Sequence, residues 1–157
     1  MTTTLPKGRI LFVDDEPALL DGIERSLRPT RQSWQCEFLT DPLAALDRIE
    51  TTPFEVIVSD MRMPGMNGAE FLARACQVAP DAVRVMLTGN NDLQTAMDAV
   101  NCGHVFQFVL KPCEGERLIE HLASAIYQQR LQLAEREVLR LKLEQADKMV
   151  VVGKLAA

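Results

Sequence analysis

Acidic residues follow two short apolar runs of this sequence, at places where carboxylates could bind a metal ion or take part in phosphoryl chemistry. Residues 56–58 are β-branched and typical of a strand buried on both faces, and Asp60 comes just after them. The run at residues 10–13 is followed by three consecutive acidic residues, 14–16. Because adjacent carboxylates repel one another, such a cluster is costly unless a cation or a basic group neutralises it. A site for a hard metal ion with oxygen ligands is therefore one interpretation.

Both acidic groups also have a purely structural interpretation. Pro64 and Gly65 break the chain after Asp60, which places Asp60 in a strand-to-helix loop where it could be only a turn former or a helix cap. One carboxylate of residues 14–16 could likewise cap a helix that has Pro17 in its first turn. Ligands bind at the carboxyl edge of a parallel sheet, so the other strand ends decide between the two interpretations.

The segments that must position these residues alternate between strand and helix patterns. Apolar runs predict five strands, each followed by a helical pattern. Five repeats of strand and helix predict an α/β fold with a doubly wound parallel sheet and helices on both faces. The predicted strands are residues 9–13, 36–40, 56–58, 84–88 and 105–110, and the helix boundaries are Pro29, an N-cap at Asp41, Pro80, a start at Asp92 and a stop at Gly103.

Parallel strands end at a common edge, so this topology predicts a cluster of reactive side chains. The first strand ends in Asp14 and Asp15, the third in Asp60, the fourth in Thr88, and the fifth is followed by Lys111. Three carboxylates can hold Mg²⁺, while a hydroxyl and an ammonium can donate to the oxygens of a bound anion. Phosphoryl transfer needs this combination, and an ionised Asp can itself be the nucleophile that forms an acyl phosphate.

The ordered set of strand ends resembles the receiver domain of two-component response regulators. The resemblance covers about residues 9–127 and implies a flavodoxin-like fold with five parallel strands in the order 2-1-3-4-5. It divides the chain into a flexible tail (1–8), a receiver domain (9–127) and a helical coiled-coil linker (128–157). The matching segments are residues 13–16, 59–68, 87–89 and 110–112.

The resemblance assigns the phosphoacceptor and the metal ligands. Asp60 would accept a phosphoryl group from a phosphohistidine of a cognate histidine kinase or phosphotransfer protein. Mg²⁺ would be held by Asp15, Asp60 and the backbone carbonyl of Arg62, with Asp14 acting largely through water.

The resemblance also assigns switch and tuning positions. After the conformational switch that phosphorylation causes in this family, Thr88 would bind a phosphoryl oxygen. Lys111 would form an ion pair with the negatively charged phosphoryl group. Phe108 stands where the family has its aromatic switch residue, and this role is compatible with a packed strand aromatic. Arg62 and Asn90 occupy the positions that tune the phosphoryl lifetime. Arg62 could contact the phosphoryl group or be a solvated loop residue, so the lifetime stays open.

The last part of the chain predicts one long helix, since no Pro or Gly occurs between Gly115 and Gly153. Two stripes of apolar residues continue along this helix beyond about Arg130, where the domain can no longer cover them. We expect a parallel coiled coil that forms a homodimer; a frayed linker is the alternative, because Gln145 and Lys148 interrupt the first stripe. The stripes are Leu131, Ala134, Val138 and Leu141, and Leu139, Leu143, Ala146 and Val150.

Residues 146–157 resemble the lead-in to the dimerisation and phosphotransfer helix of histidine kinases, which predicts a kinase module after Ala157. His104 and His121 lack the setting of a phosphoaccepting His, and we expect them to be structural or surface residues. The alternatives are a receiver with another output, such as a cyclic-dinucleotide phosphodiesterase, or a stand-alone partner-binding regulator.

Two further function classes are disfavoured. A phosphatase-like enzyme needs a general acid beside its nucleophile, and Met61 and Arg62 offer none. A pseudo-receiver that binds partners without phosphorylation is disfavoured because the acidic, Thr and Lys positions are all filled.

Composition bounds the remaining possibilities. The 157 residues, 47% hydrophobic and 25% charged, allow one domain and an appendage. A net charge of −5 without an acidic or basic block disfavours nucleic acid or anionic membrane as a direct partner. No apolar stretch is long enough to span a membrane, so we expect a cytoplasmic chain. The cysteines lack metal or disulfide spacing and are expected to be reduced packing residues: Cys36, Cys76, Cys102 and Cys113.

Overall fold

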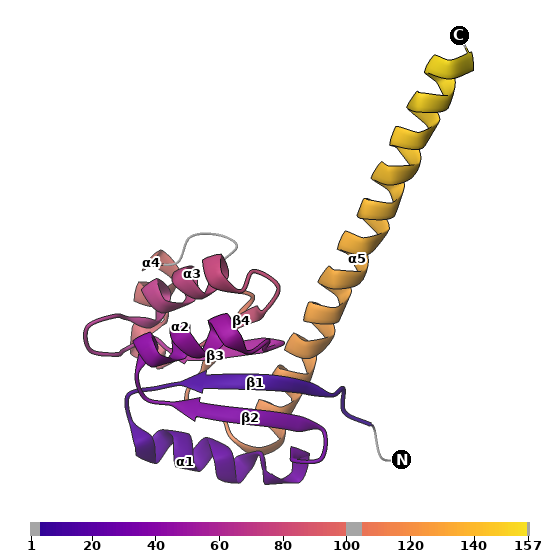
Figure 1. Cartoon of the computed structure of the whole chain (residues 1–157). Helices are drawn as coiled ribbons and strands as arrows, with labels where there is room; N and C mark the ends of the chain where they lie inside the picture. The colour runs from indigo at the N-terminus through magenta and orange to yellow at the C-terminus, as the bar shows by residue number, and fades with distance from the viewer. Residues whose placement is uncertain (1–3, 100–104, 157) are drawn as a thin grey trace.

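Five strands form one parallel sheet in the order β2-β1-β3-β4-β5. Figure 1 labels β1 to β4 and shows β1 beside β2. From β1 the chain moves to one edge of the sheet, and from β3 onward it moves to the other, which is the doubly wound order predicted from the sequence. The computed structural model describes residues 4–99 and 105–156. The strands are β1 (Gly8–Val13), β2 (Trp34–Leu39), β3 (Val56–Asp60), β4 (Val83–Thr88) and β5 (Gln107–Leu110).

Helices cover both faces of the sheet. The buried hydrophobic side chains form two clusters, one on each face of the sheet. The first cluster packs α1 and α5 against one face, and the second packs α2, α3 and α4 against the other. Cys102, Gly103 and His104, on which the sequence raised expectations, lie outside the described residues. The helices are α1 (Pro17–Ser26), η1 (Arg28–Thr30), α2 (Pro42–Thr51), α3 (Gly68–Val78), η2 (Asn90–Asp92), α4 (Leu93–Ala99) and α5 (Gly115–Ala156).

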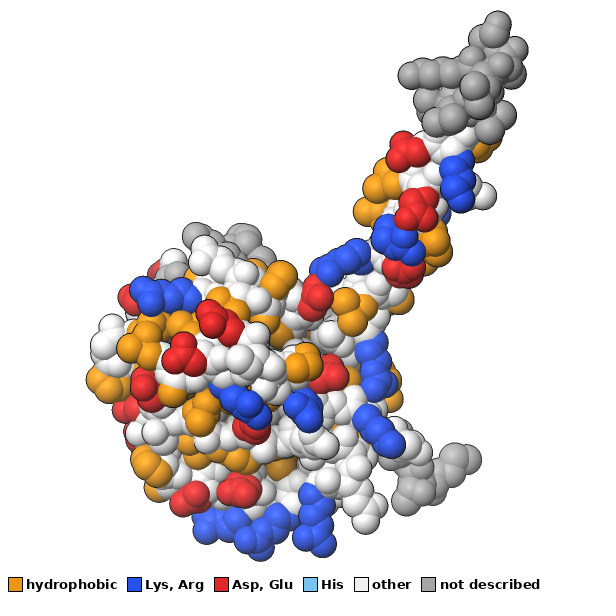
Figure 2. Space-filling model, viewed as in Figure 1, with side chains coloured by type: hydrophobic (Ala, Val, Ile, Leu, Met, Phe, Trp, Pro, Cys, Tyr) orange, Lys and Arg blue, Asp and Glu red, His pale blue; other side chains and the backbone are white. Residues whose placement is uncertain are grey.

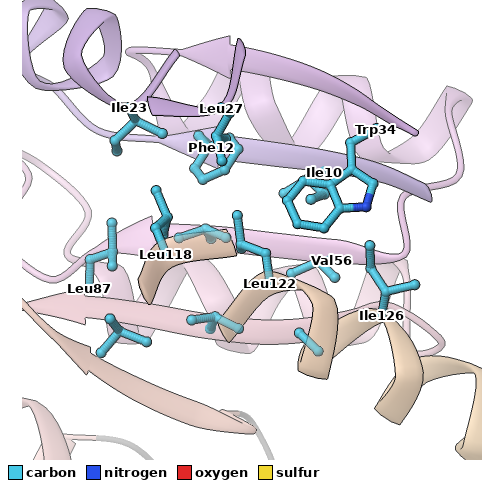
Figure 3. Close-up of a cluster of buried hydrophobic side chains, with 14 of the residues drawn as sticks. Ile10, Phe12, Ile23, Leu27, Trp34, Val56, Leu87, Leu118, Leu122 and Ile126 are labelled. Atoms are coloured by element: carbon cyan, nitrogen blue, oxygen red, sulfur yellow. The ribbon is translucent and has the colours of Figure 1, made fainter. Parts of the chain in front are cut away.

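The central strand β1 is buried on both sides because its side chains alternate between the two clusters. Ile10 and Phe12 face the cluster that contains Leu122 and Ile126 of α5, and Figure 3 shows these side chains packed between the sheet and the helix. Leu11 and Val13, which alternate with Ile10 and Phe12 along the strand, belong to the cluster on the opposite face of the sheet. Burial on both faces explains why this strand reads as a continuous apolar run.

Element boundaries differ from the sequence prediction mainly at the outer strands. β2 begins at Trp34, two residues before the expected start, and β5 begins only at Gln107. Both are edge strands. In β2 polar residues interrupt the apolar ones near its start, whereas Val105 and Phe106 extend the apolar run before β5 beyond the strand itself. Asp60 is the last residue of β3 and lies just before the loop in which it was expected. The predicted N-cap is confirmed, since the Asp41 carboxylate accepts a hydrogen bond from Leu43 N at 3.1 Å.

Part of the segment 1–8, predicted as a flexible tail, packs against the domain. Gly8 already belongs to β1, and the buried Trp34 donates its indole N–H to the carbonyl of Pro6 at 2.7 Å. Arg130 of α5 donates to the carbonyl of Lys7 at 2.7 Å. A buried indole N–H needs an acceptor, and the start of the chain provides it.

The helix α5 is 42 residues long, and its second half projects away from the domain (Figure 1). Arg136 forms an exposed ion pair with Asp81, which precedes β4, so the helix still contacts the domain at this residue. Hydrophobic side chains are exposed along the projecting part, interspersed with charged ones in Figure 2. Within the described residues, no helix combines the length and apolarity needed to cross a membrane.

Cysteine and histidine side chains within the described residues have packing roles or surface positions. Cys36, Cys76 and Cys113 are free thiols of intermediate burial, and burial raises the pKa of the Cys36 thiol to about 12. His121 Nδ1 lies 2.6 Å from Gln107 Nε2 and so links α5 to β5.

Candidate functional site

Five polar residues predicted from the sequence lie at or just beyond the carboxyl ends of four strands. Asp60 and Thr88 are the last residues of β3 and β4, Asp14 and Asp15 follow β1 directly, and Lys111 follows β5. Since these strands are parallel neighbours, their ends form one edge of the sheet. The topology therefore brings residues from distant parts of the sequence into one region.

Backbone hydrogen bonds continue the sheet past its last regular residues and hold the loops in place. Met61 N donates to Leu87 O at 3.1 Å, and Lys111 N donates to Thr88 O at 2.9 Å. The peptide bond between Lys111 and Pro112 is cis. The side chains of Asp60 and Lys111 are thus positioned by the rigid strands rather than by free loops.

The ammonium of Lys111 is shared by two buried carboxylates. Its Nζ lies 2.5 Å from Asp60 Oδ1 and 3.8 Å from Asp14 Oδ2. The pKa of Asp14 is raised from its ordinary value of 3.8 to about 6. Burial is the main cause, and the charges of Asp60 and Asp15 act in the same direction, while a 3.0 Å hydrogen bond from Glu16 N and the Lys111 charge act against it. One cation does not balance the three carboxylates.

The acidic cluster has the donor set of a divalent-cation site. Asp14, Asp15 and Asp60 each offer one carboxylate oxygen, and these oxygens lie within 4.8 Å of one another. Asp14 Oδ2 is buried and has no hydrogen-bond partner among the described residues. Carboxylate oxygens around an unbalanced negative charge are the ligands that Mg²⁺ prefers, so the residues present fit this ion.

An open cleft of about 540 Å³ gives access to the cluster. Asp15, Asp60 and Lys111 line it from the strand ends. Arg62, whose backbone carbonyl was expected to bind the metal, and Gly89 line it from the two neighbouring loops. The cleft has room for a phosphoryl group next to the Asp60 carboxylate.

A second hollow, of about 570 Å³, lies between α1 and β2. Arg25, Arg28 and Arg31 line it together with the carboxylates of Asp21 and Glu24. Because the two signs of charge offset one another there, this hollow has weaker grounds for an ionic ligand than the cleft at Asp60.

The predicted switch residues lie close to the cluster but make contacts of their own. Thr88 is fully buried, and its hydroxyl donates to the carbonyl of Gly89 at 3.3 Å. Phe108 is half-buried and packs against the core cluster that contains Ala96 of α4. Asn90 is exposed at the start of η2. Thr88 thus contacts Gly89, which directly precedes η2, and Phe108 lies beside the core cluster to which α4 contributes Ala96.

Arg62 forms an ion pair that the sequence did not reveal. Its guanidinium binds Asp92 Oδ1, although 79% of the Arg62 side chain is exposed. Asp92 was predicted only as a helix start, and it is the last residue of η2. Its carboxylate also lines the cleft. No pattern along the sequence indicates a contact between residues 30 positions apart.

Gly68 is a second residue whose role the sequence did not reveal. A Cβ at this position would lie 2.2 Å from the backbone oxygen of Asp60 and 2.9 Å from Met61 Cα. Gly68 N donates to the carbonyl of Met61 at 2.8 Å, and the side chain of Asn67 caps α3 by accepting from Glu70 N. The first turn of α3 thus packs directly against the backbone of Asp60, which only Gly permits.

Comparison with known proteins identifies relatives of this arrangement. The family described as response regulator receiver domain matches residues 10–123. The transcriptional regulatory protein FixJ of Bradyrhizobium diazoefficiens is 36% identical over 129 residues, which are 82% of this chain and 60% of FixJ. The hydrogenase transcriptional regulatory protein HoxA of Cupriavidus necator is 33% identical over 126 residues, 80% of this chain and 26% of HoxA.

A solved structure extends the comparison to three dimensions. It is titled as adenylate cyclase from Rhodopirellula baltica, has 39% sequence identity and superposes with a TM-score of 0.76 over 85% of this chain and 98% of that chain. The present chain spans between about a quarter and three fifths of the length of the two regulatory proteins.

Proposed function

This chain belongs to the family of response regulator receiver domains, and from that premise we propose that Asp60 accepts a phosphoryl group from a phosphohistidine. The observation that carries the proposal is the setting of the Asp60 carboxylate. It lies in the open cleft, 2.5 Å from the ammonium of Lys111, and shares a possible cation site with Asp14 and Asp15. A carboxylate nucleophile that attacks an anionic donor needs positive charge beside it, which Lys111 and a cation bound to the three carboxylates would supply together.

The proposed reaction transfers one phosphoryl group. A carboxylate oxygen of Asp60 forms a bond to phosphorus, the bond between phosphorus and the imidazole nitrogen of the donor breaks, and the imidazole leaves with the electron pair. Lys111 stabilises the charge on the transferred group. Mg²⁺, when bound, would neutralise charge on the carboxylates and the phosphoryl oxygens. We assign its ligands as Asp15, Asp60 and the carbonyl of Arg62, with Asp14 acting through water.

Thr88 and Phe108 are proposed to read the phosphorylation state. Thr88 ends β4 next to the acceptor strand, and rotation of its hydroxyl from the carbonyl of Gly89 would let it donate to a phosphoryl oxygen. Phe108 is only half-buried beside the core cluster, so its ring can move further inward as the β4 end changes. The domain acts in this scheme as a phosphoacceptor and signalling switch rather than as a turnover enzyme.

We further propose that the projecting part of α5 forms a parallel homodimeric coiled coil that carries the signal onward. Exposed apolar side chains at helical spacing support this proposal, because they are unpartnered within the described chain: Leu131, Val138, Leu139, Leu141 and Leu143. The similarity of residues 146–157 to the lead-in of a histidine kinase helix favours a kinase as the output.

A second candidate output is transcriptional control. It is favoured by the names of FixJ and HoxA, which are both transcriptional regulatory proteins. A phosphoaccepting His within about two helical turns after Ala157 would support the kinase, and a DNA-binding segment there would support the second candidate.

The phosphoacceptor proposal is tested with acetyl phosphate and Mg²⁺ as a small-molecule phosphoryl source. Wild type should incorporate one phosphoryl group, seen as a mass increase of the intact protein, and Asp60→Asn should incorporate none. Asp21→Asn, which neutralises an exposed carboxylate on α1, is the matched control and should be labelled like wild type. Labelling of Asp60→Asn to the wild-type extent would show that the site assignment is wrong.

A further inference from the structure

The ion pair between Arg62 and Asp92 joins the two loops that border the acceptor cleft. Arg62 follows the phosphoacceptor strand β3, and Asp92 ends η2, which follows β4. Both residues line the same cleft as Asp60 and Lys111. The pair therefore lies at the cleft in which a phosphoryl group on Asp60 would be bound.

Asp92 is also tied to the start of α4. Its backbone N–H donates to the carbonyl of Gly89 at 3.0 Å, and α4 begins at the next residue, Leu93. Among the α4 residues whose burial is described, 93–98, only Ala96 is buried. An element with so few buried side chains is held weakly, so a polar contact at the residue just before it adds to what keeps it in position.

A phosphoryl group would compete with Asp92 for the guanidinium of Arg62. It carries close to two negative charges near neutral pH, whereas the carboxylate of Asp92 carries one. Arg binds phosphoryl oxygens through charge-assisted hydrogen bonds that are frequently bidentate. Because 79% of the Arg62 side chain is exposed, the guanidinium can turn without breaking core contacts.

We propose that Asp92 is a positioning residue: it holds Arg62 in the unphosphorylated protein, and phosphorylation of Asp60 draws Arg62 onto the phosphoryl group and releases Asp92 together with the start of α4. This inference rests on the proposed phosphoacceptor function. The ion pair between Arg62 and Asp92 would transmit the effect of phosphorylation at Asp60 to α4. It would also stabilise the unphosphorylated state by a contact that the phosphorylated state lacks. The ion pair then weakens the binding of a phosphoryl group by the free energy that it contributes.

The test is a double-mutant cycle on the affinity for beryllofluoride, a stand-in for the phosphoryl group, in the presence of Mg²⁺. Asp92→Asn should bind beryllofluoride about twofold to fivefold more tightly than wild type, which lies within the range of roughly 1.4-fold to fivefold that an exposed ion pair can contribute. In the Arg62→Gln background the same substitution should change the affinity by less than about 1.5-fold, because the competing pair is already absent. Asp92→Glu keeps the pair and should restore the wild-type affinity.

The matched control is Asp98→Asn, which removes a negative charge from α4 at an exposed position and should leave the affinity unchanged. Hydrogen exchange of residues 93–98 supplies a second readout, and Asp92→Asn should accelerate it without beryllofluoride. If Asp92→Asn changed the beryllofluoride affinity by the same factor in wild type and in Arg62→Gln, the inference would be overturned. Asp92 would then act only through its charge and not through its pair with Arg62. Unchanged exchange in Asp92→Asn would overturn the link to α4. Failure of wild type to bind beryllofluoride and to be labelled by acetyl phosphate would instead refute the phosphoacceptor function itself.

Discussion

Lys111 Nζ lies 2.5 Å from Asp60 Oδ1, so the proposed phosphoacceptor is ion-paired before any phosphoryl group arrives. The Lys111 side chain is 28% exposed and that of Asp60 is 9% exposed, which places the pair at the floor of the cleft rather than on the surface. Lys111 holds the carboxylate in place, and its flexible side chain allows the ammonium to turn toward a phosphoryl oxygen. The same ammonium also repels a metal ion bound to the neighbouring carboxylates.

Replacement of Lys111 should therefore separate metal binding from phosphorylation. In Lys111→Gln we expect tighter Mg²⁺ binding, because a positive charge beside the ligands is lost, but a rate of labelling by acetyl phosphate that is at least roughly tenfold lower. Titration with Mg²⁺ and intact mass over time measure the two effects. Lys142→Gln on the exposed part of α5 is the control. A parallel loss of both properties would indicate that Lys111 only maintains the fold of the site.

Asp14 should make the metal-free protein less stable at neutral pH than at mildly acidic pH. Its pKa is raised by burial from 3.8 to about 6, so the folded state binds this proton more tightly than the unfolded state. The cost of the ionised carboxylate is fully present above about pH 6 and disappears as the pH falls toward 4. We expect Asp14→Asn in EDTA to raise the free energy of unfolding at pH 7 by about 1–3 kcal/mol.

Urea unfolding in EDTA between about pH 4 and pH 7.5 checks this prediction. The stabilisation by Asp14→Asn should shrink at the acidic end, because wild type loses the same cost there by protonation. Asp21→Asn is again the exposed control. Equal stabilities of Asp14→Asn and wild type across this range would mean that the buried carboxylate is not penalised.

The strand ends of this site could be predicted from the sequence because the topology itself places them together. Each of the inner strands is an apolar run that ends in a polar residue or is followed directly by one, and parallel order then brings Asp14, Asp60 and Thr88 to one edge. The contact of Arg62 with Asp92 could not be predicted, since it depends on how two loops lie across the cleft. The edge strand β2 was placed two residues late because Gln35 and Glu37 alternate with its apolar residues, so no continuous apolar run marks its start.

The close packing of Gly68 against Asp60 should make this position intolerant of any side chain. Gly68→Ala would put a methyl group 2.2 Å from Asp60 O, so either α3 or the acceptor strand must move. We expect a loss of about 1–3 kcal/mol in the free energy of unfolding and slower labelling by acetyl phosphate. Gly22→Ala in α1 is the control, since its Cβ would meet only the end of the Arg25 side chain at 3.9 Å and should stabilise the helix. Wild-type stability and labelling of Gly68→Ala would contradict the packing argument.

The exposed face of α5 around Val138 should decide the oligomeric state. Ala134, Val138 and Leu139 line a shallow groove of about 310 Å³, and Val138 is 51% exposed, as expected for a side chain that packs into a partner helix. Leu133 lies on the opposite face of α5. At 3.6 residues per turn it shares that face with Glu137 and Arg140, which form an ion pair. Val138→Glu should therefore turn a dimer into a monomer, whereas Leu133→Glu should remain dimeric.

Light scattering with and without Mg²⁺ and beryllofluoride measures the molar mass of each variant. A wild-type dimer under both conditions would mean that the coil is permanent and transmits a change in helix packing or register, as a following kinase helix would require. A monomer that dimerises only with beryllofluoride would mean that phosphorylation controls assembly, and it would favour the other outputs. In either case Val138→Glu must weaken the dimer and Leu133→Glu must not, because the coil needs the apolar face and not the charged one. A wild-type chain that is monomeric under both conditions would contradict the coiled coil and leave α5 as a solvated linker.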